Sequence, residues 1–135
     1  MTNPLVLVDS SVLLDVLIAD STHFARSSAA LSAAIDDAGV AINPVIYAEV
    51  SVGFDEIERL EESLPPQLFP MLQIPREALF LAGKAFVRYR RGGGPRRSPL
   101  PDFFIGAHAA VLGMTLLTRD TGRLSYFPGV RLIQP

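Results

Sequence analysis

The first hydrophobic segment of the chain is an unbroken run from Leu5 to Val8, which ends at Asp9, Ser10 and Ser11. A short continuous run of branched apolar residues is typical of a strand buried on both faces of a sheet. In open α/β sheets, ligands bind just beyond the carboxyl ends of the strands. The pattern therefore makes Asp9 a candidate site residue, although Asp and Ser at this position would also cap a helix.

Strands and helices are predicted to alternate along the rest of the chain. Apolar runs predict further strands at residues 40–42, 72–74, 114–118 and 130–133. Helical spacing, caps and breakers predict helices over residues 12–18, 24–37, 44–53, 76–91 and 102–112, and an acidic helix ending near residue 63. This alternation predicts parallel βαβ units in an α/β fold. We expect a three-layer α/β/α sandwich around a parallel sheet of about five strands, in a single domain spanning residues 1–135.

Charge is unevenly distributed, although the formal net charge is only −2. The stretch from Asp55 to Glu62 is acidic, and the stretch from Lys84 to Arg97 contains six basic residues and no acidic residue. The basic stretch is either a phosphate-binding rim for RNA or a solvated helix face followed by a loop. The first half of this basic stretch belongs to the predicted helix over residues 76–91. On that helix, the spacing of apolar residues predicts a buried stripe of side chains that runs from Leu79 to Tyr89.

Composition narrows the protein class. A chain of 135 residues with 49% hydrophobic and 19% charged residues is typical of one globular domain with a substantial core. There is no cysteine, so disulfides and thiolate metal sites are excluded, and any metal must be held by oxygen or histidine. The sequence shows neither a signal-peptide pattern nor a membrane-spanning run, so we expect a cytoplasmic protein with no membrane partner.

Glu49 interrupts the apolar pattern of the predicted helix that begins at Pro44. Its neighbours at three- and four-residue spacing are Val45, Ile46, Val52 and Gly53. A carboxylate in an apolar stripe costs several kcal/mol unless a partner satisfies it. Glu49 is therefore a functional residue, the partner of a buried arginine, or a residue at the edge of the stripe.

Two further carboxylates lie at the ends of predicted elements. Asp102 begins a helix, where the macrodipole favours an anion of any function, and Asp120 follows a strand, where an ordinary turn residue would also fit. With Asp9 and Glu49 they can converge on one cleft, where they would repel one another without a cation. Hard oxygen ligands without a cysteine or histidine cluster indicate Mg²⁺ or Mn²⁺.

Four short segments carry a resemblance to a known family. They are residues 8–14 (VDSSVLL), 47–49 (YAE), 101–109 (PDFFIGAHA) and 117–120 (LTRD). In order and spacing they resemble the motifs of PIN domains and, within that group, of the VapC-type toxins of prokaryotic toxin–antitoxin pairs. The resemblance covers essentially the whole chain.

The resemblance implies a metal-dependent endoribonuclease toxin that cleaves RNA phosphodiester bonds and is held inactive by a cognate VapB-type antitoxin. It also implies an α/β/α sandwich, a homodimer, and a Mg²⁺ cofactor for which Mn²⁺ can substitute. The family's acidic quartet maps onto Asp9, Glu49, Asp102 and Asp120. Ser10 and Thr118 match supporting hydroxyls, and Ser11 stands where many relatives carry Asn.

Two alternatives remain beside the nuclease. One is a PIN-like module that binds RNA or protein without cleaving it. The other, a phosphate-switch receiver, requires a lysine at a late strand end, whereas the only lysine, Lys84, falls within a predicted helix. His108 lies about 120° round its helix from Asp102, among apolar neighbours, so we expect a packed core histidine and not a metal ligand.

Overall fold

The sheet at the centre of the molecule is parallel throughout. The structure is a computed structural model that describes residues 3–93, 100–122 and 124–135. Its strands are β1 (Val6–Val8), β2 (Val40–Ala41), β3 (Thr115–Leu117) and β4 (Leu132–Ile133). They lie in the order β2-β1-β3-β4, and all three pairings are parallel. The two central strands are therefore the first and third along the chain, and their carboxyl ends meet at one edge.

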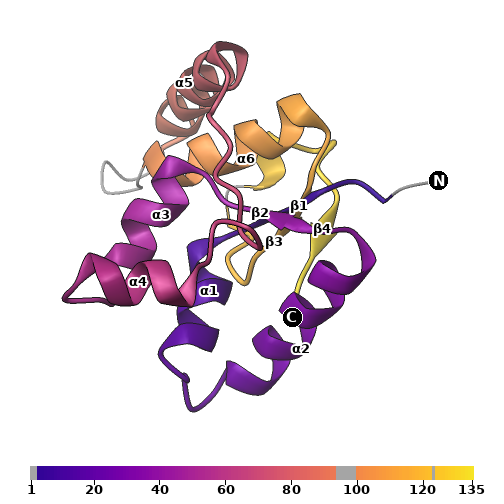
Figure 1. Ribbon diagram of the computed structural model, residues 1–135. Helices are drawn as coiled ribbons and strands as arrows, with labels where there is room; N and C mark the ends of the chain where they lie inside the picture. Colours follow the sequence, from indigo (N-terminus) through magenta and orange to yellow (C-terminus); the bar gives the residue numbers. More distant parts are fainter. Residues whose placement is uncertain (1–2, 94–99, 123) are drawn as a thin grey trace.

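Helices cover both faces of this sheet. They are α1 (Ser10–Leu17), α2 (Phe24–Asp37), α3 (Pro44–Ser51), α4 (Ile57–Ser63), α5 (Arg76–Arg91) and α6 (Leu100–Leu112), and a short 3₁₀ helix, η1, spans Leu124–Tyr126. Figure 1 shows α5 and α6 above the sheet and α1 and α2 below it. The predicted α/β/α sandwich is confirmed.

The predicted strand at residues 72–74 is reduced to a single bridge between Ile42 and Met71. The Ile42 amide donates to the Pro70 carbonyl at 3.0 Å, and the Leu72 amide donates to the Ile42 carbonyl at 2.8 Å. Pro70 and Pro75 flank this bridge and have no amide hydrogen, so the ladder cannot extend past either of them. The described sheet consequently has four strands, where the sequence predicts about five.

The core has two parts. The larger surrounds β1, whose Leu7 and Val8 are fully buried, and the smaller lies between α5 and α6 around Phe103. On α5 the buried residues are Ala78, Ala82 and Ala85, while Leu79 is 42% exposed. The predicted inner stripe was therefore wrong at Leu79. The small alanine side chains let α5 approach α6 closely. The buried face of α5 therefore begins at Ala78, one position before the predicted Leu79, and Leu79 remains exposed.

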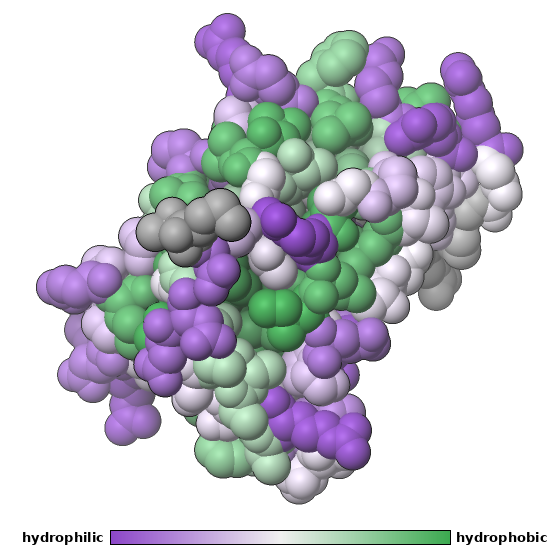
Figure 2. All heavy atoms as spheres, turned by 90° about the vertical axis from the view of Figure 1, so that its right-hand side faces the viewer, coloured by the Kyte–Doolittle hydropathy of each residue, from purple (hydrophilic) through white to green (hydrophobic). Residues whose placement is uncertain are grey.

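The surface combines apolar and hydrophilic regions. Figure 2 shows the side of the molecule that lies at the right of Figure 1, where apolar surface gathers near the centre between hydrophilic side chains. A groove of about 610 Å³ lies between α2, the N-terminal segment and β4. Among the described helices, none combines the length and the hydrophobicity that a membrane span requires.

Candidate active site

Asp9 lies where β1 passes into α1, and its side chain is held on both oxygens. As the N-cap of α1, its Oδ1 accepts a hydrogen bond from the Ser10 amide at 2.9 Å. Its Oδ2 accepts from the Ser11 hydroxyl at 2.9 Å and from the Thr118 hydroxyl at 2.7 Å. Asp9 is 9% exposed. The capping role expected of this residue is real, and it fixes the carboxylate at the sheet edge.

The segment after β3 brings Asp120 to the same edge. The Thr118 hydroxyl, which donates to Asp9, also accepts from the Asp120 amide at 3.0 Å. Asp120 Oδ1 accepts from the Gly122 amide at 3.1 Å, so the turn role considered for Asp120 is also present. Thr118 therefore links the Asp9 carboxylate to the backbone of Asp120.

Glu49 reaches this edge from α3, which Asn43 caps by accepting from the Ile46 amide at 2.8 Å. Its Oε1 accepts a hydrogen bond from the Ser10 hydroxyl at 3.0 Å. Burial raises the pKa of Glu49, and the negative charges of Asp9 and Asp102 raise it further, against the lowering effect of the Ser10 hydrogen bond. Within the described residues the only ion pair is formed elsewhere, so Glu49 has no arginine partner among them.

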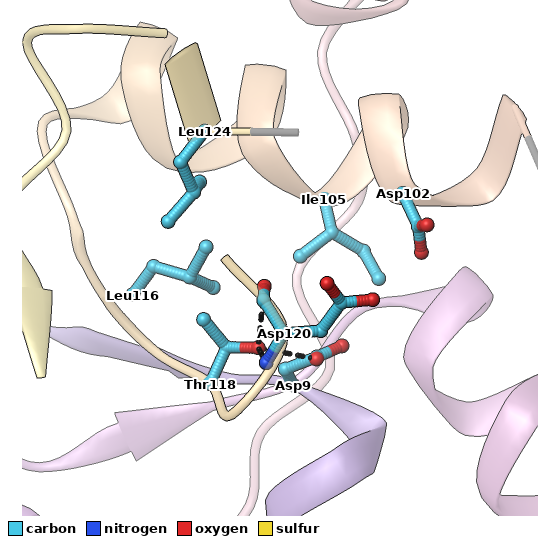
Figure 3. Close-up of a pocket in the computed structure, with 7 residues that line it drawn as sticks. All are labelled: Asp9, Asp102, Ile105, Leu116, Thr118, Asp120 and Leu124. Atoms are coloured by element: carbon cyan, nitrogen blue, oxygen red, sulfur yellow. Dashed lines mark hydrogen bonds between the residues drawn. The ribbon is translucent and has the colours of Figure 1, made fainter. Parts of the chain in front are cut away.

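Asp102 lies in the first turn of α6. It shares a small pocket of about 20 Å³ with Asp9 and Asp120, and the other lining residues are Ile105, Leu116, Thr118 and Leu124. Figure 3 shows the carboxylates of Asp9, Asp102 and Asp120 gathered below α6. All four predicted acids thus belong to one neighbourhood, three as pocket walls and Glu49 through Ser10 and through its electrostatic interaction with Asp9 and Asp102.

The sequence interpretation missed one polar network at the back of this site. Asp15 on α1 is buried, and its two oxygens accept from Arg119 Nε at 2.6 Å and Nη2 at 3.0 Å, while the Ser27 hydroxyl donates at 2.7 Å. Burial raises the pKa of Asp15, but its bonds to Arg119 and Ser27 and the charge of Arg119 hold that pKa below its ordinary value. This ion pair fixes the position of Arg119, which lies between Thr118 and Asp120 in the chain. A carboxylate in an apolar helix was the available signal, as it was for Glu49.

His108 is a core residue, as predicted. It is fully buried, and its Nδ1 accepts a hydrogen bond from the Asn43 amide group at 3.1 Å, which puts the ring proton on Nε2. Nε2 has no hydrogen-bond partner among the described residues. Burial lowers the pKa of His108, so the ring is neutral near pH 7. Since Asn43 caps α3, this contact ties the helix of Glu49 to the helix of Asp102.

The donor chemistry of the site fits a hard divalent cation. Within the described part of the chain no three carboxylate or imidazole side chains form a ready metal-binding cluster. Burial raises the pKa of Glu49, and the nearby charges of Asp9 and Asp102 raise it further, so these acids interact electrostatically. Carboxylate oxygens are the ligands that Mg²⁺ and Mn²⁺ prefer. Asp9, Asp102 and Asp120, which line the pocket, are the residues that would hold such an ion.

Comparison with known proteins gives a consistent result. The family model described as PIN domain matches residues 6–128. The fold is similar to that of VapBC2 from Rickettsia felis bound to a promoter DNA fragment, with 15% identity, a TM-score of 0.73, and coverage of 97% of this chain and 98% of the other. It is also similar to FitAcB from Neisseria gonorrhoeae (21%, 0.71, 96% and 97%) and to a toxin–antitoxin complex from Klebsiella pneumoniae (22%, 0.71, 96% and 97%). No curated protein sequence matches the chain.

Proposed function

The chain belongs to the PIN domain family, and on that premise we propose that it is a metal-dependent endoribonuclease whose centre is formed by Asp9, Glu49, Asp102 and Asp120. PIN domains are generally nucleases, so the proposal concerns the substrate, the ion and the residues. The observation that carries it is the acid pocket, in which Asp9 and Asp120 from the sheet edge face Asp102 from α6. All four members of the family's quartet are present and lie together.

Each residue has a distinct part in this proposal. Asp9, Asp102 and Asp120 would hold Mg²⁺ or Mn²⁺, and Glu49 would complete the charge of the site. A divalent ion supplies a lower pKa for its bound water and neutralises charge on a phosphate. Ser10 orients Glu49, and Thr118 orients Asp9, through the hydrogen bonds described above. The neutral, buried His108 serves packing and takes no part in proton transfer.

We also propose that the protein is the toxin of a toxin–antitoxin pair. One similar structure is described as a toxin–antitoxin complex and another as VapBC2, which supports a VapB-type antitoxin as the partner here. A groove of about 160 Å³ between α3 and α4 is lined by five apolar or hydroxyl-bearing residues and two acids: Tyr47, Ser51, Phe54, Asp55, Glu56, Ile57 and Leu60. An apolar segment with basic flanks would fit it. The homodimer is proposed from the family resemblance, and the cytoplasmic location expected from the sequence is kept as part of the proposal.

The test of the nuclease is cleavage of end-labelled total RNA and tRNA by purified, partner-free protein with Mg²⁺, with Mn²⁺ and with EDTA. We expect discrete products that require the metal and are lost in Glu49→Gln. Cleavage at equal rates by wild type and Glu49→Gln would identify a contaminant. No cleavage, combined with tight RNA binding in EDTA, would favour the alternative of a non-catalytic RNA-binding module.

A further inference from the structure

One face of α5 carries a line of exposed cations that the acid pocket does not use. The predicted basic stretch runs from Lys84 to Arg97, but Arg96 and Arg97 lie outside the described residues. Of the described part, Lys84, Arg88 and Arg91 are spaced by four and then three residues, so they lie on one side of the helix. All three are exposed. Phe80 begins the same line and is 68% exposed.

Two of these cations lie against aromatic rings, and the described residues place no carboxylate against them. Lys84 Nζ lies 5.1 Å from the centre of the Phe80 ring, and Arg88 Cζ lies 5.9 Å from the centre of the Tyr126 ring. Across the described residues, no carboxylate lies within 4.0 Å of any cation on α5. Basic residues in a last turn also stabilise the helix dipole, which accounts for Arg88 and Arg91 but not for Lys84 in the middle of the helix.

The line leads toward the acid pocket. The Tyr89 and Phe103 rings lie 5.5 Å apart, so the carboxyl end of α5 is level with the first turn of α6, where Asp102 lies. Tyr126, which Arg88 covers, contacts Phe103 at 5.6 Å and belongs to the same 3₁₀ helix as Leu124, a wall of the pocket. The cationic line and the pocket are thus joined through η1 and α6.

We propose that Phe80, Lys84, Arg88 and Arg91, here called the α5 track, bind one strand of unpaired RNA and deliver it to the acid pocket. Neighbouring track positions rise about 4.5–6 Å along the helix axis, which suits successive phosphates of an extended strand. Phe80 offers an exposed ring on which a base can stack. This inference rests on RNA as the substrate of the proposed nuclease, but binding along the track requires neither cleavage nor the metal.

The test measures RNA binding in EDTA. The fluorescence anisotropy of a labelled single-stranded RNA of about 20 nucleotides reports the binding constant over a range of salt concentrations. Each phosphate contact adds about 0.7 to the slope of log K against log salt for a single strand. The triple variant Lys84→Gln, Arg88→Gln, Arg91→Gln should lower the slope by about two and weaken binding at least tenfold. Phe80→Ala should weaken binding without changing the slope.

Arg90→Gln is the matched control. Arg90 belongs to the same helix end and lies over the Phe86 ring at 5.9 Å, but it points about 200° away from Arg88. It should leave affinity and slope unchanged. An unchanged slope in the triple variant, or an equal loss in Arg90→Gln, overturns the track.

Two measurements distinguish failure of the α5 track from failure of the proposed nuclease. If the triple variant alters sedimentation of the protein without altering RNA binding, the track is a protein contact and the proposal is wrong. Metal-dependent cleavage by wild type together with an unchanged salt slope overturns the track and leaves the nuclease standing. A track-dependent slope without cleavage supports the track and overturns the nuclease.

Discussion

Glu49 shows how one carboxylate can report on a whole site. Nothing in the packing of α3 requires an acid at this position, and its nearest donor is the Ser10 hydroxyl. Its pKa is raised because it is half-buried and because Asp9 and Asp102 are negative. A side chain whose ionised form is unfavourable in the metal-free protein is one that a cation would stabilise.

The first prediction concerns that unfavourable charge. A raised pKa means that the native state binds the proton more tightly than the unfolded chain does, so ionised Glu49 costs stability as the pH rises through its native pKa. Glu49→Gln should therefore raise the melting temperature of metal-free protein near pH 7. The gain should vanish below the ordinary pKa of 4.5. Glu58→Gln, on the exposed face of α4, is the control, and an equal gain there would refute the explanation.

The second prediction concerns the pair of Asp15 and Arg119. Arg119→Ala leaves a buried carboxylate without its cation, and we expect a loss of about 2 kcal/mol in the free energy of unfolding at pH 7. Because the pKa of Asp15 is lowered, the stability it contributes is present above its ordinary value of 3.8 and is lost as the pH falls through the lower native value.

Denaturant unfolding at several pH values checks this second prediction. The cost of Arg119→Ala should shrink in acid, where Asp15 is protonated. Arg26→Ala, whose side chain forms no ion pair among the described residues, should change the unfolding free energy by less than about 0.5 kcal/mol. A pH-independent loss in Arg119→Ala would mean that packing, and not charge, is what Arg119 supplies.

At the scale of elements, the sequence predicted what local patterns control. The helix over residues 24–37 was predicted at the bounds observed for α2, because its apolar spacing and the glycine that ends it are local signals. The prediction of a strand at residues 72–74 was wrong. Two prolines limit the hydrogen-bond ladder there to one bridge, and its partner residue is distant in sequence. Asp15 was missed because its partner, Arg119, lies 104 residues away.

The site followed the same rule. Asp9, Asp102 and Asp120 were found because each lies at the end of an element, and the ends of elements can be read from the sequence. The electrostatic coupling of Glu49 to Asp9 and Asp102 depends on how α3 and α6 pack, and His108 with Asn43 sets part of that packing. No pattern within either helix encodes that contact.

The third prediction tests the contact between α6 and the segment after η1. A Cβ on Gly106 would lie 2.6 Å from Cδ2 and 2.7 Å from Cε2 of the buried Phe127 ring, so Gly106→Ala should destabilise the protein by about 1–3 kcal/mol. On α5, a Cβ at Gly83 meets nothing within 4 Å, and Gly83→Ala should stabilise it by about 1 kcal/mol. Thermal unfolding compares the two, and effects of the same sign would contradict this packing.

At the scale of the whole molecule, the fold gathers four carboxylates from separate elements at one edge of the sheet. The carboxyl ends of β1 and β3 supply two acids, and the helices α3 and α6 supply the other two. Donors from Ser10, Ser11 and Thr118 hold the Asp9 carboxylate in place. The folded protein should therefore bind a divalent cation more tightly than the unfolded chain does.

The fourth prediction follows from that preference. Free Mn²⁺ at one hundred times its Kd should stabilise the fold by about 2.7 kcal/mol, seen as a higher melting temperature that EDTA reverses. Asp102→Asn should keep or raise the metal-free melting temperature and lose most of the response to Mn²⁺. A large metal-free destabilisation would show that Asp102 is chiefly structural, and an unchanged response would remove it from the site.

The central claim is that acids from different layers of the fold act as one catalytic centre. The direct measurement is the rate of Mg²⁺-dependent cleavage of one labelled RNA by wild type, Glu49→Gln, Asp102→Asn and the double variant. Groups that act as a unit are strongly non-additive. We predict that each single variant loses nearly all activity and that the double variant is no slower than the slower single variant. Losses that multiply, or a single variant that keeps the wild-type rate, would contradict the claim.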